Sequence, residues 1–218
     1  MKIIIDDVSK NIKKLPIITN VSLHLESGKI YGLRGKNGAG KTMLLRLICG
    51  LVLPTSGKIT IDNLELGKDL SFPDSLGILI ENPGLITNYS GIKNLMTLAS
   101  IKDEIDQHTI IDLMNYFDLD PNDNKKVKNY SLGMKQKIGI ISAVMENPKI
   151  ILLDEPLNGL DEESTQKVLD LLTNRKEKGA LIIVASHDKE ELDFLADEII
   201  EMKTGKVLRQ YGVDKNAR

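Results

Sequence analysis

Short runs of apolar, mostly β-branched residues alternate along this chain with longer stretches of helical pattern. Such alternation predicts an α/β fold. Two of the runs, 150–153 and 181–185, are apolar throughout and favour central strands of a mainly parallel sheet that is covered on both faces. The runs near the N-terminus are shorter and mixed in polarity, which indicates an N-terminal antiparallel β layer. The predicted strands are 2–8, 29–33, 58–62, 77–80, 150–153, 181–185, 198–202 and 206–210.

Between Tyr89 and Asn147 the pattern changes from strands to helices. The sequences ENPG at 81–84 and NPK at 147–149 mark the joins of this segment with the core, because proline interrupts regular structure. We therefore predict a single domain over residues 1–218 with a helical insertion. Its core is about 1–84 and 148–218, and its helical subdomain is about 85–147.

Composition and charge exclude several classes of protein. The chain has 29 basic and 31 acidic residues, so no global field favours nucleic acid or an anionic membrane as partner. Its single cysteine, Cys49, rules out an internal disulfide and fits a reducing compartment. Neither a signal peptide nor a window of roughly 20 consecutive apolar residues is present. We therefore expect a cytoplasmic chain that reaches a membrane only through another protein.

The sequence GKNGAGKT at 35–42 matches the phosphate-loop pattern, in which two glycines separated by four residues are followed by Lys and Thr. It follows a predicted strand and opens a helix, so backbone N–H groups and the helix dipole can surround phosphates. Lys41 is expected to place its charge on the outer phosphates, and Thr42 its hydroxyl on Mg²⁺. The predicted nucleotide site consists of Gly35, Lys36, Asn37, Gly38, Ala39, Gly40, Lys41 and Thr42.

Two adjacent acids, Asp154 and Glu155, follow the apolar run at 150–153. Such a pair is by itself compatible with a solvated turn. A phosphate loop in the same sheet favours another role, because Mg²⁺ held by Thr42 and phosphate oxygens needs a further hard oxygen ligand. We predict that Asp154 is this ligand and that Glu155 orients and deprotonates the attacking water.

Two further positions are candidates for contact with phosphate. His187 follows the run at 181–185, at the sheet edge where ligands of open α/β sheets bind, although a purely structural role next to a helix cap is the alternative. In YSLGMKQK at 130–137, Ser131 is a natural N-cap, and no acid occurs before Glu146. This helix start is suited to an external anion, with an ordinary capped helix as the alternative.

Taken together, these motifs resemble those of the nucleotide-binding subunit of ABC transporters over practically the whole chain. GKNGAGKT resembles the Walker A loop, YSLGMKQ the signature loop, ILLDEP Walker B, LNGLD the D-loop, and the pair SH at 186–187 the switch histidine. The resemblance implies a single ABC ATP-binding domain with a P-loop NTPase core. It also implies an ATPase that hydrolyses ATP to ADP and phosphate, with ATP and Mg²⁺ bound.

The resemblance further implies a head-to-tail homodimer that forms on ATP binding. ATP would lie between the Walker A loop of one protomer and the signature loop of the other, where Ser131 and Gly133 hold the γ-phosphate. Glu155 would polarise the attacking water and His187 would contact the γ-phosphate. Asp161 would couple the two sites across the dimer.

The chain departs from the family pattern at two positions near the site. Ile12 stands where the family commonly stacks adenine on an aromatic ring, so we expect an aliphatic contact with the base. Glu81 stands where the family usually has glutamine, and its carboxylate is a candidate Mg²⁺ ligand, with a simple turn acid as the alternative. Glu81 and YSLGMKQ together are similar to bacterial exporters of lantibiotics and bacitracin-like peptides.

The implied function is a motor subunit that drives a separate integral-membrane transporter subunit, with a peptide antibiotic or drug as exported cargo. The chain would lie on the inner face of the cell membrane and dock through Glu81, Asn82 and residues 85–95. The alternative is an ABC-type ATPase that acts on nucleic acid or the ribosome. Such relatives have a long coiled-coil insertion or two fused cassettes, which this sequence lacks, so we expect no nucleic-acid partner.

Overall fold

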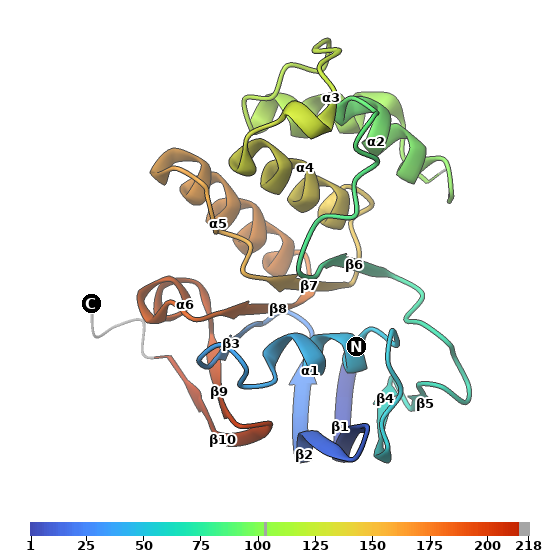
Figure 1. Cartoon of the computed structure of the whole chain (residues 1–218), viewed down its shortest axis with the longest axis vertical. Helices are drawn as coiled ribbons and strands as arrows, with labels where there is room; N and C mark the ends of the chain where they lie inside the picture. Colours follow the sequence, from blue (N-terminus) through green and yellow to red (C-terminus); the bar gives the residue numbers. More distant parts are fainter. Residues whose placement is uncertain (103, 214–218) are drawn as a thin grey trace.

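A computed structural model describes residues 1–102 and 104–213 of the chain. It contains a four-stranded sheet in the order β2-β1-β4-β5 and a six-stranded sheet in the order β10-β9-β3-β8-β7-β6. The pairs in the first sheet are antiparallel, and those in the second are parallel except for β9 with β10. The predicted α/β class, with an antiparallel N-terminal layer and a mainly parallel sheet, is thereby confirmed (Figure 1).

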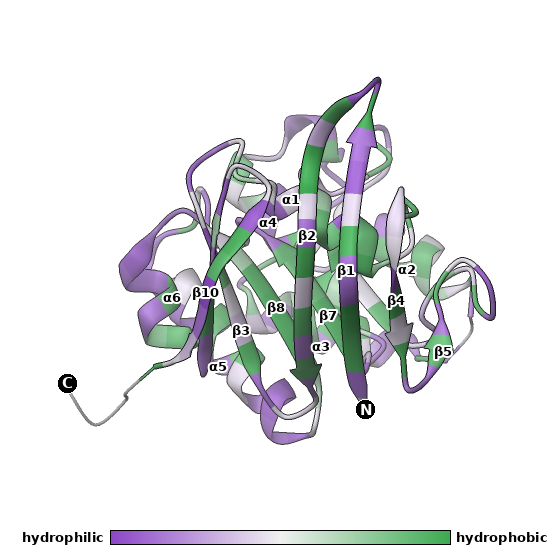
Figure 2. Ribbon diagram, turned by 90° about the horizontal axis from the view of Figure 1, so that it is seen from below, coloured by the Kyte–Doolittle hydropathy of each residue, from purple (hydrophilic) through white to green (hydrophobic). Residues whose placement is uncertain are grey.

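The antiparallel sheet contains two strands that were absent from the prediction, β2 and β5. β2, which lies next to β1 in Figure 2, alternates between buried and exposed residues from Val21 to Leu25, as expected for a strand with one covered face. Pro16 and the left-handed Asn20, with φ 47°, interrupt this period and hide the strand in the sequence. The strands of this sheet are β1 (Lys2–Ile12), β2 (Leu15–Glu26), β4 (Ser56–Ile61) and β5 (Leu64–Glu65).

The two central strands of the parallel sheet, β7 and β8, are buried at every residue, as their continuous apolar runs predict. Alternate residues of β7 enter different cores. Ile151 and Leu153 pack with α4 and α5, whereas Ile150 and Leu152 pack with α1 and the antiparallel sheet. The strands of this sheet are β3 (Ile30–Arg34), β6 (Leu76–Leu79), β7 (Ile150–Asp154), β8 (Leu181–Ser186), β9 (Glu198–Lys203) and β10 (Lys206–Gly212).

The helices cover the two faces of the parallel sheet. Figure 1 shows α1 between the sheets and α2, α3 and α4 together at the far end of the molecule. None of the helices in the described part of the chain is both long enough and apolar enough to span a bilayer. The helices are α1 (Lys41–Ile48), α2 (Gly91–Ala99), α3 (Gln107–Tyr116), the 3₁₀ turn η1 (Val127–Asn129), α4 (Leu132–Val144), α5 (Glu162–Glu177) and α6 (Lys189–Leu195).

The helix α4 lies directly against the edge strand β6. A Cβ atom added to Gly77 would stand 1.7 Å from the carbonyl oxygen of Ala143 and 2.8 Å from Pro148 Cγ. A clash with backbone cannot be relieved by a change of rotamer, so only a shift of α4 could accommodate it. Gly77 therefore fixes how closely the helical segment approaches the sheet.

We predict that Gly77→Ala lowers the free energy of unfolding by about 2–3 kcal/mol, the cost typical of overpacking. Urea unfolding followed by circular dichroism measures the change. Gly84→Ala is the matched control, because a Cβ at Gly84 meets nothing within 4 Å, and its change should stay within about 0.5 kcal/mol. Equal midpoints for the two variants would contradict this packing of α4.

Candidate active site

The carboxyl ends of three neighbouring strands meet at one edge of the parallel sheet. β3 ends at Arg34, β7 at Asp154 and β8 at Ser186. In the paired register Arg34 lies beside Ser186, and Asp154 lies beside Ala185. Segments that are far apart in the sequence therefore emerge together, at the kind of edge where open α/β sheets bind ligands.

The loop of residues 35–40 joins β3 to α1 and depends on left-handed glycines. Gly38 has φ 80° and Gly40 has φ 103°, values that glycine adopts readily. Gly40 is the N-cap of α1, and among the described residues no side chain caps this helix or adds an acid to its first turn. The N–H groups and partial positive charge at the start of α1 are thus available to phosphate.

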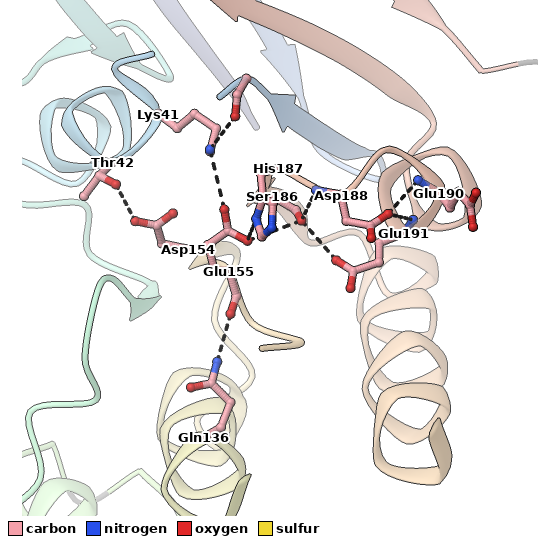
Figure 3. Close-up of polar contacts among 11 residues, drawn as sticks. Lys41, Thr42, Gln136, Asp154, Glu155, Ser186, His187, Asp188, Glu190 and Glu191 are labelled. Atoms are coloured by element: carbon pink, nitrogen blue, oxygen red, sulfur yellow. Dashed lines mark hydrogen bonds and ion pairs between the residues drawn. The ribbon is translucent and has the colours of Figure 1, made fainter. Parts of the chain in front are cut away.

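Lys41 is the first residue of α1, and its side chain is buried in the site, 6% exposed. Its Nζ donates to the carbonyl oxygen of Gly35 at 2.7 Å and lies 3.5 Å from Glu155 Oε1 (Figure 3). The loop therefore encloses an ammonium group next to the acid pair. This is the place for a positive charge on the outer phosphates of a nucleotide.

Thr42 and Asp154 are joined by a short hydrogen bond, in which Thr42 Oγ1 donates to Asp154 Oδ2 at 2.6 Å. Burial raises the pKa of Asp154, and the hydrogen bond from Thr42 opposes this rise. In the described part of the chain, no cluster of three or more His, Cys, Asp or Glu side chains could hold a metal alone. Two hard oxygens that need phosphate and water to complete the shell fit Mg²⁺.

Glu155 has a left-handed backbone, with φ 49°, which is uncommon for a residue other than glycine. Its N–H donates to the carbonyl oxygen of Ala185 at 2.8 Å. Its carboxylate lies between Lys41 and His187, with Oε2 at 2.9 Å from His187 Nδ1 (Figure 3). The backbone turn thus points Glu155 away from Asp154's hydrogen bond with Thr42 while keeping both acids in one site.

His187 lies beside this carboxylate and its side chain is 57% exposed. The N-cap of the adjacent helix α6 is Asp188 and not His187, because Asp188 accepts hydrogen bonds from the N–H groups of Glu190 and Glu191. Capping of α6 therefore belongs to Asp188. The ring of His187 is free of that task and faces the site, where contact with the γ-phosphate stays a prediction.

Ser131, Gly133 and Asp161 lie at other helix starts. Ser131 caps α4 by accepting from the Met134 N–H at 3.1 Å, and Asp161 caps α5 by accepting from the Ser164 N–H at 2.7 Å. None of the three is among the described residues that line the pockets beside the phosphate loop. Within a single chain, therefore, the structure does not bring them to Lys41.

Two pockets of about 410 and 760 Å³ adjoin the phosphate loop, a size suited to a small ligand. The smaller pocket contains Lys41, Asp154 and Ile17. Ile12 lies at the end of β1, 44% exposed, and is not among the described residues that line either pocket. Ile17 belongs to the unpredicted strand β2, so the sequence provided no signal for its place in the pocket.

Glu81 lines the same pocket as Asp154 but already has a partner. Its Oε2 lies 2.8 Å from Nη2 of Arg46, which is in the last turn of α1. The backbone at Glu81 is left-handed, with φ 61°. In this arrangement the carboxylate forms an ion pair with Arg46, and its role as a Mg²⁺ ligand stays a prediction.

Three residues that contact predicted site residues were not predicted themselves: Arg46, Gln136 and Ser186. Ser186 Oγ lies 3.4 Å from Glu155 Oε2 and 3.0 Å from Glu191 Oε2. Ser186 and Gln136 both stand inside motifs discussed above, next to His187 and within YSLGMKQK. Neither motif indicates which atoms these side chains contact, because the contacts depend on the tertiary arrangement.

Several known proteins are similar to this chain in sequence. A profile described as ABC transporter matches residues 18–158. The uncharacterised ABC transporter ATP-binding protein YybJ of Bacillus subtilis is 44% identical over 92% of each chain. The lantibiotic transport ATP-binding protein SrtF of Streptococcus pyogenes is 35% identical over 96% of this chain and 90% of its own. The bacitracin transport ATP-binding protein BcrA of Enterococcus faecalis is 31% identical over 96% of this chain and 69% of its own.

Solved structures give the same result. An ATP-binding subunit of an ABC transporter shares the fold, with a TM-score of 0.90 and 24% identity over 98% of this chain and 91% of its own. A dimeric ATP-binding cassette in a post-hydrolysis state, bound to ADP and Pi, has a TM-score of 0.87 and 25% identity. The match covers 97% of this chain and 99% of that cassette.

We predict that Asp154→Asn raises the melting temperature at pH 7 in the absence of nucleotide and Mg²⁺ by about 2–4 °C. Burial raises the folded-state pKa of Asp154 above its unfolded value, so the protonated form favours folding, and this stability is lost as the pH rises through the folded pKa. The asparagine variant avoids that loss. Differential scanning calorimetry should show that the gain disappears below about pH 3, where Asp154 is protonated in the unfolded state as well.

Asp161→Asn is the control with the opposite sign. Hydrogen bonds from the Ser164 hydroxyl and N–H lower the pKa of Asp161 in the folded state. Its ionised form therefore stabilises the fold at pH values above the ordinary pKa of Asp. This variant should melt at a slightly lower temperature at pH 7. A shift of the same sign in both variants would contradict the assignment of Asp154 as a buried carboxylate without a cation.

Proposed function

Because the chain belongs to the ABC transporter family as an ATP-binding subunit, we propose that its ATP hydrolysis drives a separate membrane-spanning subunit that exports a peptide antibiotic or drug. Family membership makes it an ATPase and the motor subunit of a transporter. The observation that carries the proposal is the meeting of Lys41, Asp154 and Glu155 at one sheet edge. That arrangement supports phosphoryl transfer to water.

The residues of the chain have distinct tasks in this reaction. Loop 35–40 and Lys41 bind the phosphates of ATP through N–H groups and charge. Thr42 and Asp154 would hold Mg²⁺, which neutralises negative charge on the phosphates. Glu155 accepts a proton from water as the water oxygen bonds to the γ-phosphorus and the bond from that phosphorus to the β–γ bridging oxygen breaks. The products are ADP and inorganic phosphate.

The site is completed by a second copy of the chain. Ser131 and Gly133 stand at the start of α4, away from the pockets at the phosphate loop of their own chain. A head-to-tail homodimer formed on ATP binding would place them against the γ-phosphate held by the partner, with Asp161 near the dimer interface. The dimeric cassettes among the similar structures support this assembly.

The cargo and the membrane partner are inferred from relatives and from the surface near Glu81. The relatives SrtF and BcrA are transport proteins for a lantibiotic and for bacitracin, which favours export of peptides over action on nucleic acid. A pocket of about 180 Å³ is lined by Asn82 and Pro83 and by the exposed side chains of Leu51 and Ile78. We place the docking site of the membrane subunit there, on the cytoplasmic side of the membrane.

Replacement of Lys41 by Ala in the organism that encodes the chain should make the cells sensitive to a lantibiotic or bacitracin-type peptide. The lysine charge on the outer phosphates is lost, so we expect nucleotide affinity to fall about 100-fold, which fluorescent ATP titration of the purified variant measures. Lys58→Ala on β4, an exposed lysine, is the matched control. Unchanged sensitivity to both peptide classes, with affinity lost, would contradict the proposed cargo.

Glu81→Gln should raise the Mg²⁺ concentration needed for half-maximal phosphate release several-fold at saturating ATP, because an amide binds a hard cation more weakly than a carboxylate. Glu26→Gln is the control, since Glu26 is an exposed acid with a nearby lysine. A metal titration that matches the wild type would show that Glu81 is a turn acid held by Arg46.

A further inference from the structure

Gln136 is a buried amide that joins the helical segment to the catalytic loop of the same chain. It lies on α4, five residues after Ser131, and is 7% exposed. Its Nε2 donates to the carbonyl oxygen of Glu155 at 3.0 Å (Figure 3) and to that of Pro156 at 2.9 Å. Both N–H bonds of one amide thus hold the segment that follows β7, and nothing in the reaction above uses them.

The hydrogen bond from Gln136 to Glu155 acts on a residue with an unfavourable backbone conformation. A left-handed conformation, such as φ 49° at Glu155, costs free energy for a residue with a side chain and persists only where the surroundings hold it. Ala185 fixes the N–H of Glu155 from β8, and Gln136 fixes its carbonyl oxygen from α4. Together they aim the carboxylate at Lys41 and His187.

A second contact joins the same two segments. A Cβ atom on Gly133 would stand 2.8 Å from the carbonyl oxygen of Gly159, and one on Gly159 would stand 2.7 Å from Leu132 Cδ2. Leu132 and Gly133 in the first turn of α4 are therefore packed closely against Gly159, in the segment that follows β7. With Gln136 in the next turn, this segment is held at two points along one helix.

We propose that Gln136 is a positioning residue that couples the nucleotide bound at the start of α4 to the carboxylate of Glu155 in the same chain. The inference rests on the head-to-tail dimer proposed above, in which Ser131 holds the partner's nucleotide while Glu155 serves its own. Movement of α4 on nucleotide binding is passed through Gln136 to the backbone of Glu155. Each ATP site thereby controls hydrolysis at the other, and the coupling is reciprocal for binding.

The test compares Gln136→Met, which keeps the shape and removes both donors, with Gln166→Met. Gln166 is the matched control because its Nε2 bonds the exposed Asp170 within α5. For Gln136→Met we expect kcat to fall about 10- to 100-fold, the effect of a small misplacement of a catalytic group. The KM for ATP should stay within about twofold of the wild type, and the Hill coefficient should fall from above 1 to about 1.

A merely structural role for Gln136 would lower stability without changing the Hill coefficient. Calorimetry and circular dichroism establish that the variant folds, and if Gln136→Met does not fold, Gln136→Asn serves instead because it keeps the amide but shortens its reach. A kcat and Hill coefficient equal to those of Gln166→Met, or a wild-type Hill coefficient of 1, would overturn the inference. Absence of phosphate release from the wild type would instead count against the proposed function.

Discussion

The parallel pairing of β3, β8 and β7 determines where the side chains of the candidate site lie. It sets the ends of three strands side by side, so that Asp154 lies beside Ala185 and Ser186 beside Arg34. The hydrogen bond between Thr42 and Asp154 and the ion pair between Lys41 and Glu155 then link α1 to β7 across that edge. A shift of one residue in either register would separate these groups.

The same edge also explains why two adjacent acids have different environments. Asp154 is the last residue of a buried strand, where burial raises its pKa. Glu155 turns away from the strand through its left-handed backbone and meets Lys41 and His187. One carboxylate is thus suited to a cation, whereas the other is suited to the proton of water. Helix α4 supports the second through Gln136, which donates to the carbonyl oxygen of Glu155.

Much of the fold could be predicted because its signals are local. The apolar runs of β7 and β8 and the phosphate loop are contiguous in the sequence, and both appear where expected. Strand β2 was missed because Pro16 and the bulge at Asn20 break its alternation. The pairs Arg46 with Glu81 and Gln136 with Glu155 could not be predicted, since each joins segments whose proximity depends on how α1 and α4 pack on the sheet.

In the proposed mechanism, Glu155 acts as the base in an ATP site that two copies of the chain complete. The most direct test is the solution mass of Glu155→Gln by light scattering, with and without Mg-ATP, together with its rate of phosphate release. We expect Mg-ATP to double the mass of the variant and hydrolysis to be lost. A variant that stays monomeric and still releases phosphate would contradict this mechanism.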